Sequence, residues 1–169
     1  LHLYNGDTLN GKLQAAAGAV EKAAQQSPGE IVDGLYLAAF SRPPTAAERD
    51  ALFAIPVIQD CLAGQVTREQ YLAFLGEAYH HVKHTVPLLM ACGARLPESH
   101  AWLQGAIAHY IAEETGHEQW ILSDIAAAGG NADAVRASAP GAAAELLVAY
   151  VYDYIARRNP VGFFGMVHV

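Results

Sequence analysis

The sequence is poor in features that mark several large classes of protein. Only two cysteines occur, Cys61 and Cys92, both in segments of helical character and without the Cys-x-x-Cys spacing of zinc or redox motifs. We therefore expect buried free thiols, which fit a reducing compartment. No apolar run approaches the roughly 18 to 20 residues of a membrane span, and the first ten residues lack the basic flank and apolar core of a signal peptide. These absences predict a cytoplasmic protein without a membrane partner.

Basic residues are also scarce. Ten Lys and Arg stand against 17 Asp and Glu, which gives a net charge of −7, and the basic residues are scattered along the chain. This balance argues against a nucleic-acid partner or an anionic membrane surface. What remains is a chain of 169 residues with 53% hydrophobic content, long enough for one domain with a real core, or for a domain plus an appendage.

Periodicity and stop signals predict an all-α protein. Capping boxes at Thr45–Glu48 and Thr67–Gln70 each mark a helix start, Pro56 kinks a helix or begins a new one, and Gly129 or Gly130 is the expected left-handed C-cap. The predicted helices cover residues 8–26, 30–40, 46–62, 68–89, 97–128 and 142–158. Residues 1–46 are assigned to a helical appendage and residues 47–169 to the main domain.

The helix predicted over 97–128 carries an acid where a core-facing side chain belongs. Its apolar stripe consists of Leu103, Ile107, Tyr110, Ile111, Ile121, Leu122 and Ile125, and Glu114 lies in the middle of it. A buried carboxylate needs a partner, and His117 lies three residues away on the helix surface. An inward-facing Glu-x-x-His pair is a ligand unit of di-iron and di-manganese sites in helical proteins. The alternative is a solvated face with an incidental ion pair.

Two further helices hold candidate site residues. On the helix over 68–89, Glu77 and His81 are the inward pair, whereas His80 and Lys83 are expected to point towards solvent. Histidine serves both as a metal ligand and as a base near neutral pH, so both roles stay open. On the last helix, Ala143, Leu147, Tyr150, Val151 and Tyr154 form the expected buried stripe. Its tyrosines, Tyr150 and Tyr154, are either packed core residues or the catalytic pair.

The first fifty residues resemble a segment of a known family. The sequence LHLYNGDTLNGKL, followed by EIVDGLYLAAFSRPPTAAER, is similar to the carboxy-terminal end of a large planctomycete domain associated with cytochrome-c-like modules. The resemblance covers only this stretch, and it implies no activity for the chain. An ordinary helical hairpin is the alternative.

A second resemblance covers about residues 50–169. The segments AYHHVKHTVPLL, HYIAEETGHEQWILSDIAAAGG and AYVYDYIARRNPVGFFGMVHV resemble iron-containing members of the heme-oxygenase-like superfamily, which shares its all-helical fold with thiaminase-II-like and pyrroloquinoline-quinone-synthase-like proteins. The resemblance implies a di-iron or mononuclear iron enzyme that uses O2 on a small organic substrate. Glu114 and His117 match the family's metal-binding motif, and Glu77 and His81 are the candidate ligands from the earlier helix.

The chain departs from this family at its end. Members continue into further helices that supply more ligands, so the bundle is expected to lack its C-terminal helices, with Asp153 or His168 as partial substitutes. The last helix then lacks partners for its apolar face, which predicts a homodimer or a higher oligomer.

Three functions stay open. The first is a non-haem iron oxidase or oxygenase. The second is a metal-free enzyme of the same fold, in which Glu114, His117 and tyrosines do acid–base work on a bound heterocycle. The third is a non-catalytic helical interaction domain. Retained metal favours the first, a ligand-sized pocket without metal the second, and a collapsed pocket with Glu114 paired to a basic side chain the third.

Overall fold

The computed structural model describes residues 26–40 and 42–164, and every regular element in these ranges is a helix. The predicted all-α class is therefore confirmed. The described residues form two compact units, 26–62 and 63–164, which we treat separately. The division lies further along the chain than the predicted boundary after residue 46, and the assignment of domains stays a prediction. The helix expected over 8–26 lies almost wholly outside the described residues.

The first unit holds three helices, α2 (Pro28–Phe40), α3 (Ala46–Phe53) and α4 (Pro56–Leu62). The predicted capping box at Thr45 and Glu48 is present, and Pro56 begins a new helix. Arg49 joins α3 to α2 through an ion pair with Asp33 and a hydrogen bond to the Gly29 carbonyl. Cys61 is exposed, which corrects the expectation of a buried thiol, because the short α4 has no buried residue.

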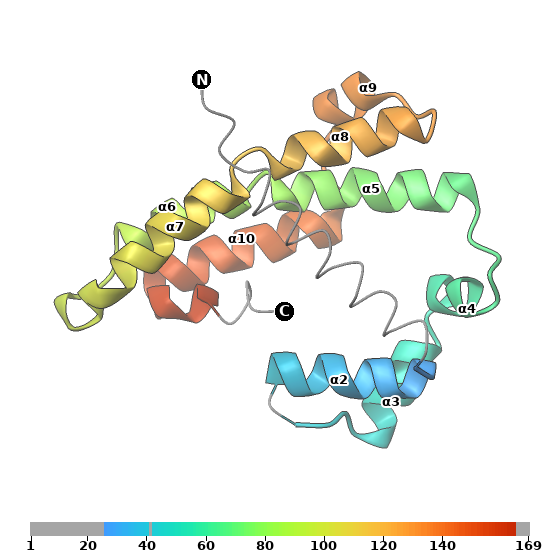
Figure 1. Ribbon diagram of the computed structural model, residues 1–169, viewed down its shortest axis with the longest axis horizontal. Helices are drawn as coiled ribbons and strands as arrows, with labels where there is room; N and C mark the ends of the chain where they lie inside the picture. The colour runs from blue at the N-terminus through green and yellow to red at the C-terminus, as the bar shows by residue number, and fades with distance from the viewer. Residues whose placement is uncertain (1–25, 41, 165–169) are drawn as a thin grey trace. The chain divides into compact units, whose positions relative to one another are not determined.

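The second unit contains the candidate site. Its elements are α5 (Arg68–Val82), α6 (Thr85–Gly93), η1 (Glu98–Leu103), α7 (Gln104–Glu114), α8 (His117–Ala127), α9 (Ala132–Ala137), α10 (Ala142–Arg157) and η2 (Pro160–Phe163). Figure 1 shows α8 lying along α5, α7 along α6, and α10 along both α5 and α6, and these pairs are in contact. Within the described ranges, no helix has the length and apolar character that a bilayer crossing requires.

Two helices predicted to be continuous are broken. The helix over 68–89 divides at Lys83–His84 into α5 and α6. Pro87 explains this break, because its ring would clash with the carbonyl of Lys83 four residues earlier in a continuous helix. The helix over 97–128 divides into η1, α7 and α8. Its main break is at Gly116, whose φ of +96° lies in the left-handed region.

The buried side chains form two separate clusters. The first joins α6, α7, α10 and η2 through Leu88, Leu89, Cys92, Ile107, Val151, Ile155 and Phe163. The second joins α5 to α8 through Leu75, Tyr79, Leu122 and Ile125. The apolar stripe predicted around Glu114 is confirmed in part. Leu103, Ile107, Leu122 and Ile125 are buried, but Ile107 packs in the first cluster and Leu122 and Ile125 in the second, so they do not form one continuous face. Cys92 is buried, as expected.

The buried face of α10 differs from the predicted one. Val148, Val151 and Ile155 are buried, whereas Leu147 and Tyr150 are exposed. Apolar residues occur almost all round this helix, so the spacing alone does not select one face. The side that packs is decided by contacts with α5, α6 and η2.

Candidate functional site

Glu114 and His117 meet at the break between α7 and α8. Glu114 is the last residue of α7 and His117 the first of α8. The Glu114 Oε2 and His117 Nδ1 atoms lie 2.8 Å apart, and the two side chains are 19% and 25% exposed. Thr115 closes α7 by donating from its N–H and its hydroxyl to the Ile111 carbonyl, at 3.1 and 2.6 Å. The predicted pair is therefore formed and partly buried.

Trp120 orients the histidine of this pair. Its ring centroid lies 4.2 Å from that of His117 at an interplanar angle of 33°, one turn further along α8. The Glu114 carboxylate thus contacts Nδ1 of the imidazole, and the Trp120 ring packs against the imidazole ring. Sequence reasoning missed Trp120, although its i+3 spacing from His117 was the signal that could have found it.

The pair suits two ligand positions of a metal site. Carboxylate oxygen and imidazole nitrogen are ligands that iron accepts. The two facing atoms are hydrogen-bonded to each other at 2.8 Å, and on binding they would present one oxygen and one nitrogen ligand to the same ion. Across residues 26–40 and 42–164, however, no group of three or more His, Cys, Asp or Glu side chains is assembled in a way that could hold a metal ion. Glu114 and His117 thus fit part of an iron site, and the described residues do not complete it.

The other predicted ligands have different surroundings. Glu77 is exposed, which corrects the expectation that it faces inward. Both of its carboxylate oxygens accept from the Gly141 N–H, at 3.1 Å each, at the start of α10, and this contact holds the side chain at the surface. His81 is half-buried near the end of α5. Asp153 pairs with Arg157 at 2.5 Å, and this ion pair lowers the pKa of its carboxyl. His168 lies outside the described residues. The metal-ligand roles of Glu77 and His81 stay predictions.

His80 is buried, which corrects the expectation that it points to solvent. It is 3% exposed, its Nε2 lies 2.9 Å from the Ser138 hydroxyl, and its Nδ1 lies 3.0 Å from the Lys83 ammonium. Burial lowers the pKa of His80, and the Lys83 charge lowers it further. The expectation was wrong because α10 and the segment before it cover this side of α5, a long-range contact that local periodicity does not reveal.

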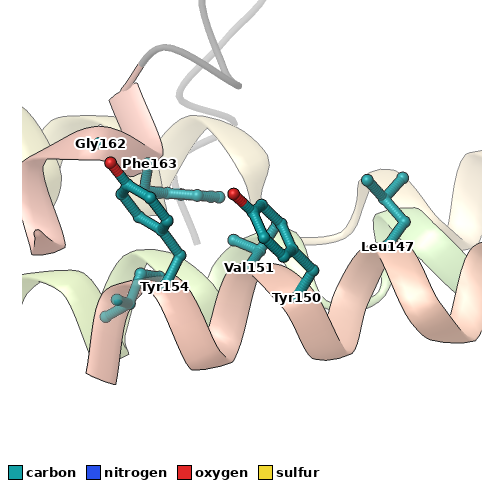
Figure 2. Close-up of a pocket in the computed structure, with 7 residues that line it drawn as sticks. Leu147, Tyr150, Val151, Tyr154, Gly162 and Phe163 are labelled. Carbon is teal, nitrogen blue, oxygen red and sulfur yellow. The ribbon is translucent and has the colours of Figure 1, made fainter. Parts of the chain in front are cut away.

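The two candidate catalytic tyrosines line a cavity of about 420 Å³. Figure 2 shows the rings of Tyr150 and Tyr154 rising from α10 beside Phe163, and their centroids lie 5.9 Å apart. Tyr150 is 63% exposed, so it is not a core residue. Gly162 permits the close approach of Tyr154, since a Cβ there would lie 2.4 Å from the tyrosine ring. A catalytic role of the two phenols stays a prediction.

Comparisons with known proteins give two matches for this chain. A family model described as "Iron-containing redox enzyme" matches residues 72–169. A crystal structure of a domain of unknown function with a heme oxygenase-like fold, from Shewanella denitrificans, is 34% identical with a TM-score of 0.60. The similarity covers 69% of this chain and 50% of that one, so this chain spans about half of that protein's length. No curated protein matches.

Proposed function

The chain belongs to the family of iron-containing redox enzymes with a heme-oxygenase-like fold, and from this premise we propose that it forms part of a non-haem iron-dependent oxidase or oxygenase. The fold and family predicted from the sequence are thereby confirmed. The iron dependence, the use of O2 and a small organic substrate are the proposal. The observation that supports it is the partly buried Glu114–His117 pair, whose facing atoms are 2.8 Å apart.

In this proposal Glu114 and His117 would supply two ligands to the iron, and Glu77 and His81 remain the candidate ligands from α5. Ferrous iron held there would supply the electrons that activate O2. The chain's own residues set up the site: Gly116 turns the backbone so that α8 begins at His117, and the Trp120 ring limits rotation of the imidazole. Side chains that are already oriented in this way need little reorganisation when the iron binds.

A metal-free enzyme of the same fold is the second candidate. The observation that favours it is the cavity of about 420 Å³ beside Tyr150 and Tyr154, which is ligand-sized and lined by two phenols. The interaction-domain reading predicts a collapsed pocket together with Glu114 paired to a basic side chain. Glu114 does pair with the imidazole of His117, but the cavity beside Tyr150 and Tyr154 is open, and this cavity is the observation against that reading. Activity that survives complete removal of metal by a chelator would support the metal-free enzyme.

The test of the iron proposal is the metal content of the chain after anaerobic incubation with ferrous iron and desalting. We expect retained iron in the wild type and at least a ten-fold loss in Glu114→Ala and His117→Ala, because each substitution removes one ligand. Circular dichroism checks that the variants stay folded.

The matched control is His109→Ala. His109 pairs with Glu113 on α7 at 3.4 Å, but this histidine is 75% exposed. The variant removes a histidine beside a glutamate without touching the proposed site, so its iron content should equal that of the wild type. An equal loss of iron in all three variants, or no iron in the wild type, would contradict the assignment of Glu114 and His117.

A further inference from the structure

A second cavity, of about 330 Å³, lies between α5 and α10, which run side by side in Figure 1. It shares no lining residue with the Glu114–His117 pair or with the cavity beside Tyr150 and Tyr154. Its polar lining consists of His80, Lys83, His84, Glu145 and Tyr152, and its apolar lining of Pro140, Ala144, Val148 and Ala149. Its volume is within the range of small-molecule sites.

The Lys83 ammonium is held in place by neutral groups. It donates a hydrogen bond to His80 Nδ1 at 3.0 Å and lies 5.4 Å from the centroid of the Tyr79 ring. The other ring nitrogen of His80 faces the hydroxyl of Ser138, which itself donates to the Val135 carbonyl. His80 Nε2 is therefore the N–H donor and Nδ1 the acceptor. These contacts orient the positive charge of Lys83 without cancelling it.

A carboxylate lines the same cavity. Glu145 lies in the first turn of α10. None of the ion pairs found among the described residues includes Lys83 or Glu145. The cavity therefore presents one cation and one anion that do not neutralise each other directly.

His84 and Tyr152 add hydrogen-bonding groups between the helices. His84 Nδ1 lies 3.3 Å from the Tyr152 hydroxyl, with the rings nearly perpendicular at 87°. Burial lowers the pKa of His84 and raises that of Tyr152, so both groups are neutral near pH 7. They offer donors and acceptors to a ligand without changing the charge balance of the cavity.

We propose that this cavity binds a small molecule that carries one carboxylate and one ammonium group joined by a short apolar chain. The carboxylate pairs with Lys83, the ammonium pairs with Glu145, and the methylene groups lie against Ala144 and Val148. A ligand with only one charge leaves the other side chain unpaired, so recognition requires both.

The test is isothermal titration calorimetry of the iron-free chain at pH 7 with glycine, β-alanine, 4-aminobutanoate and 6-aminohexanoate. Butanoate and butylamine are the single-charge comparisons. We expect at least one of the amino acids to bind ten-fold or more tightly than either comparison compound. Binding of none of them, or equal binding of butanoate or butylamine, would overturn the proposal.

Two variants test whether Lys83 and Glu145 are the charged groups that bind the ligand. Lys83→Met and Glu145→Gln are each expected to weaken binding at least ten-fold, and Glu145→Gln leaves the His80–Lys83 hydrogen bond intact. Glu98→Gln, at an exposed acid in η1, is the matched control and should bind as the wild type does. Glu114→Ala should also bind normally, which separates this site from the proposed iron site. Unchanged binding in both cavity variants would refute the assignment.

Discussion

At the scale of single residues, the histidines of the cavity between α5 and α10 contact residues from distant parts of the chain. His80 and His84 lie on neighbouring turns, yet their partners Ser138 and Tyr152 follow 58 and 68 residues later. Such contacts change the chemistry of a histidine more than its local sequence does. A buried histidine that resists protonation couples folding to pH.

The first prediction concerns this coupling at His84. Its pKa is lowered by burial and by Lys83, His81 and His80, so the unfolded chain takes up a proton at a higher pH than the folded chain does. The contribution of His84 to the free energy of unfolding is therefore fully present above about pH 6.5, the ordinary histidine value, and is lost as the pH drops from there towards the lowered pKa. Below the lowered pKa, His84 is protonated in both states and lowers the free energy of unfolding no further. Urea unfolding at several pH values measures this dependence.

In His84→Gln we expect a shallower fall of stability below about pH 6.5, because this partly buried histidine no longer titrates. His80 keeps part of the dependence. The values at pH 8, where His84 is neutral in both the folded and the unfolded chain, give the reference difference between variant and wild type. An unchanged slope in His84→Gln would show that this histidine is not the source.

At the scale of helices, the local sequence set most starts and stops. Both predicted capping boxes are present, Gly129 adopts the expected left-handed conformation, and α10 covers nearly the expected range. Arg68 of α5 then donates to the carbonyls of Ala128 and Gly129 at the end of α8, both at 2.5 Å. Such a contact satisfies carbonyls that a helix end leaves free.

The prediction at this scale concerns the break at Gly116. A Cβ at position 116 would have no neighbouring atom within 4 Å. The substitution Gly116→Ala should therefore lower the free energy of unfolding only through the left-handed backbone conformation, by about 1–2 kcal/mol. The matched control is Gly76→Ala in the interior of α5, where space is also open. It should raise stability by about 0.5–1 kcal/mol, because alanine is the better helix former. Thermal or urea unfolding gives both values, and a stabilising Gly116→Ala would contradict the account of the break.

The sequence predicted the all-α class and the Glu114–His117 pair because both depend on local spacing, and it predicted the family because three of its segments resemble that family's sequences. It missed the exposure of Tyr150 and the burial of His80, because both depend on which face of α10 packs against α5. It also missed the break before Pro87, although the proline is visible in the sequence. The cavity between α5 and α10 combines residues from positions 80–84 and 140–152, so no single motif reveals it.

At the scale of the whole molecule, α10 carries an exposed apolar face. Leu146, Leu147 and Tyr150 are all exposed on it. A face of this kind is typical of an interface. The homodimer or higher oligomer expected from the sequence stays a prediction, as does the cytoplasmic location, and this face is where the oligomer can be tested.

We predict that light scattering of the wild-type chain gives the mass of a dimer or a larger assembly. The double change Leu146→Glu and Leu147→Glu should weaken association at least ten-fold, because two charges would be buried at the interface. Met90→Glu, at an exposed position on α6, is the control and should keep the wild-type mass. A monomeric wild type would contradict the prediction.

The separation of the second unit into two buried clusters has a consequence for its motions. Glu114 ends a helix of the cluster around Leu89, and His117 begins a helix of the cluster around Leu122. Clusters of this kind can open as separate cooperative units, which native-state hydrogen exchange resolves. An ion bound by both side chains would link the two clusters. The binding free energy would then oppose the opening of either cluster, and the amides of both would exchange more slowly.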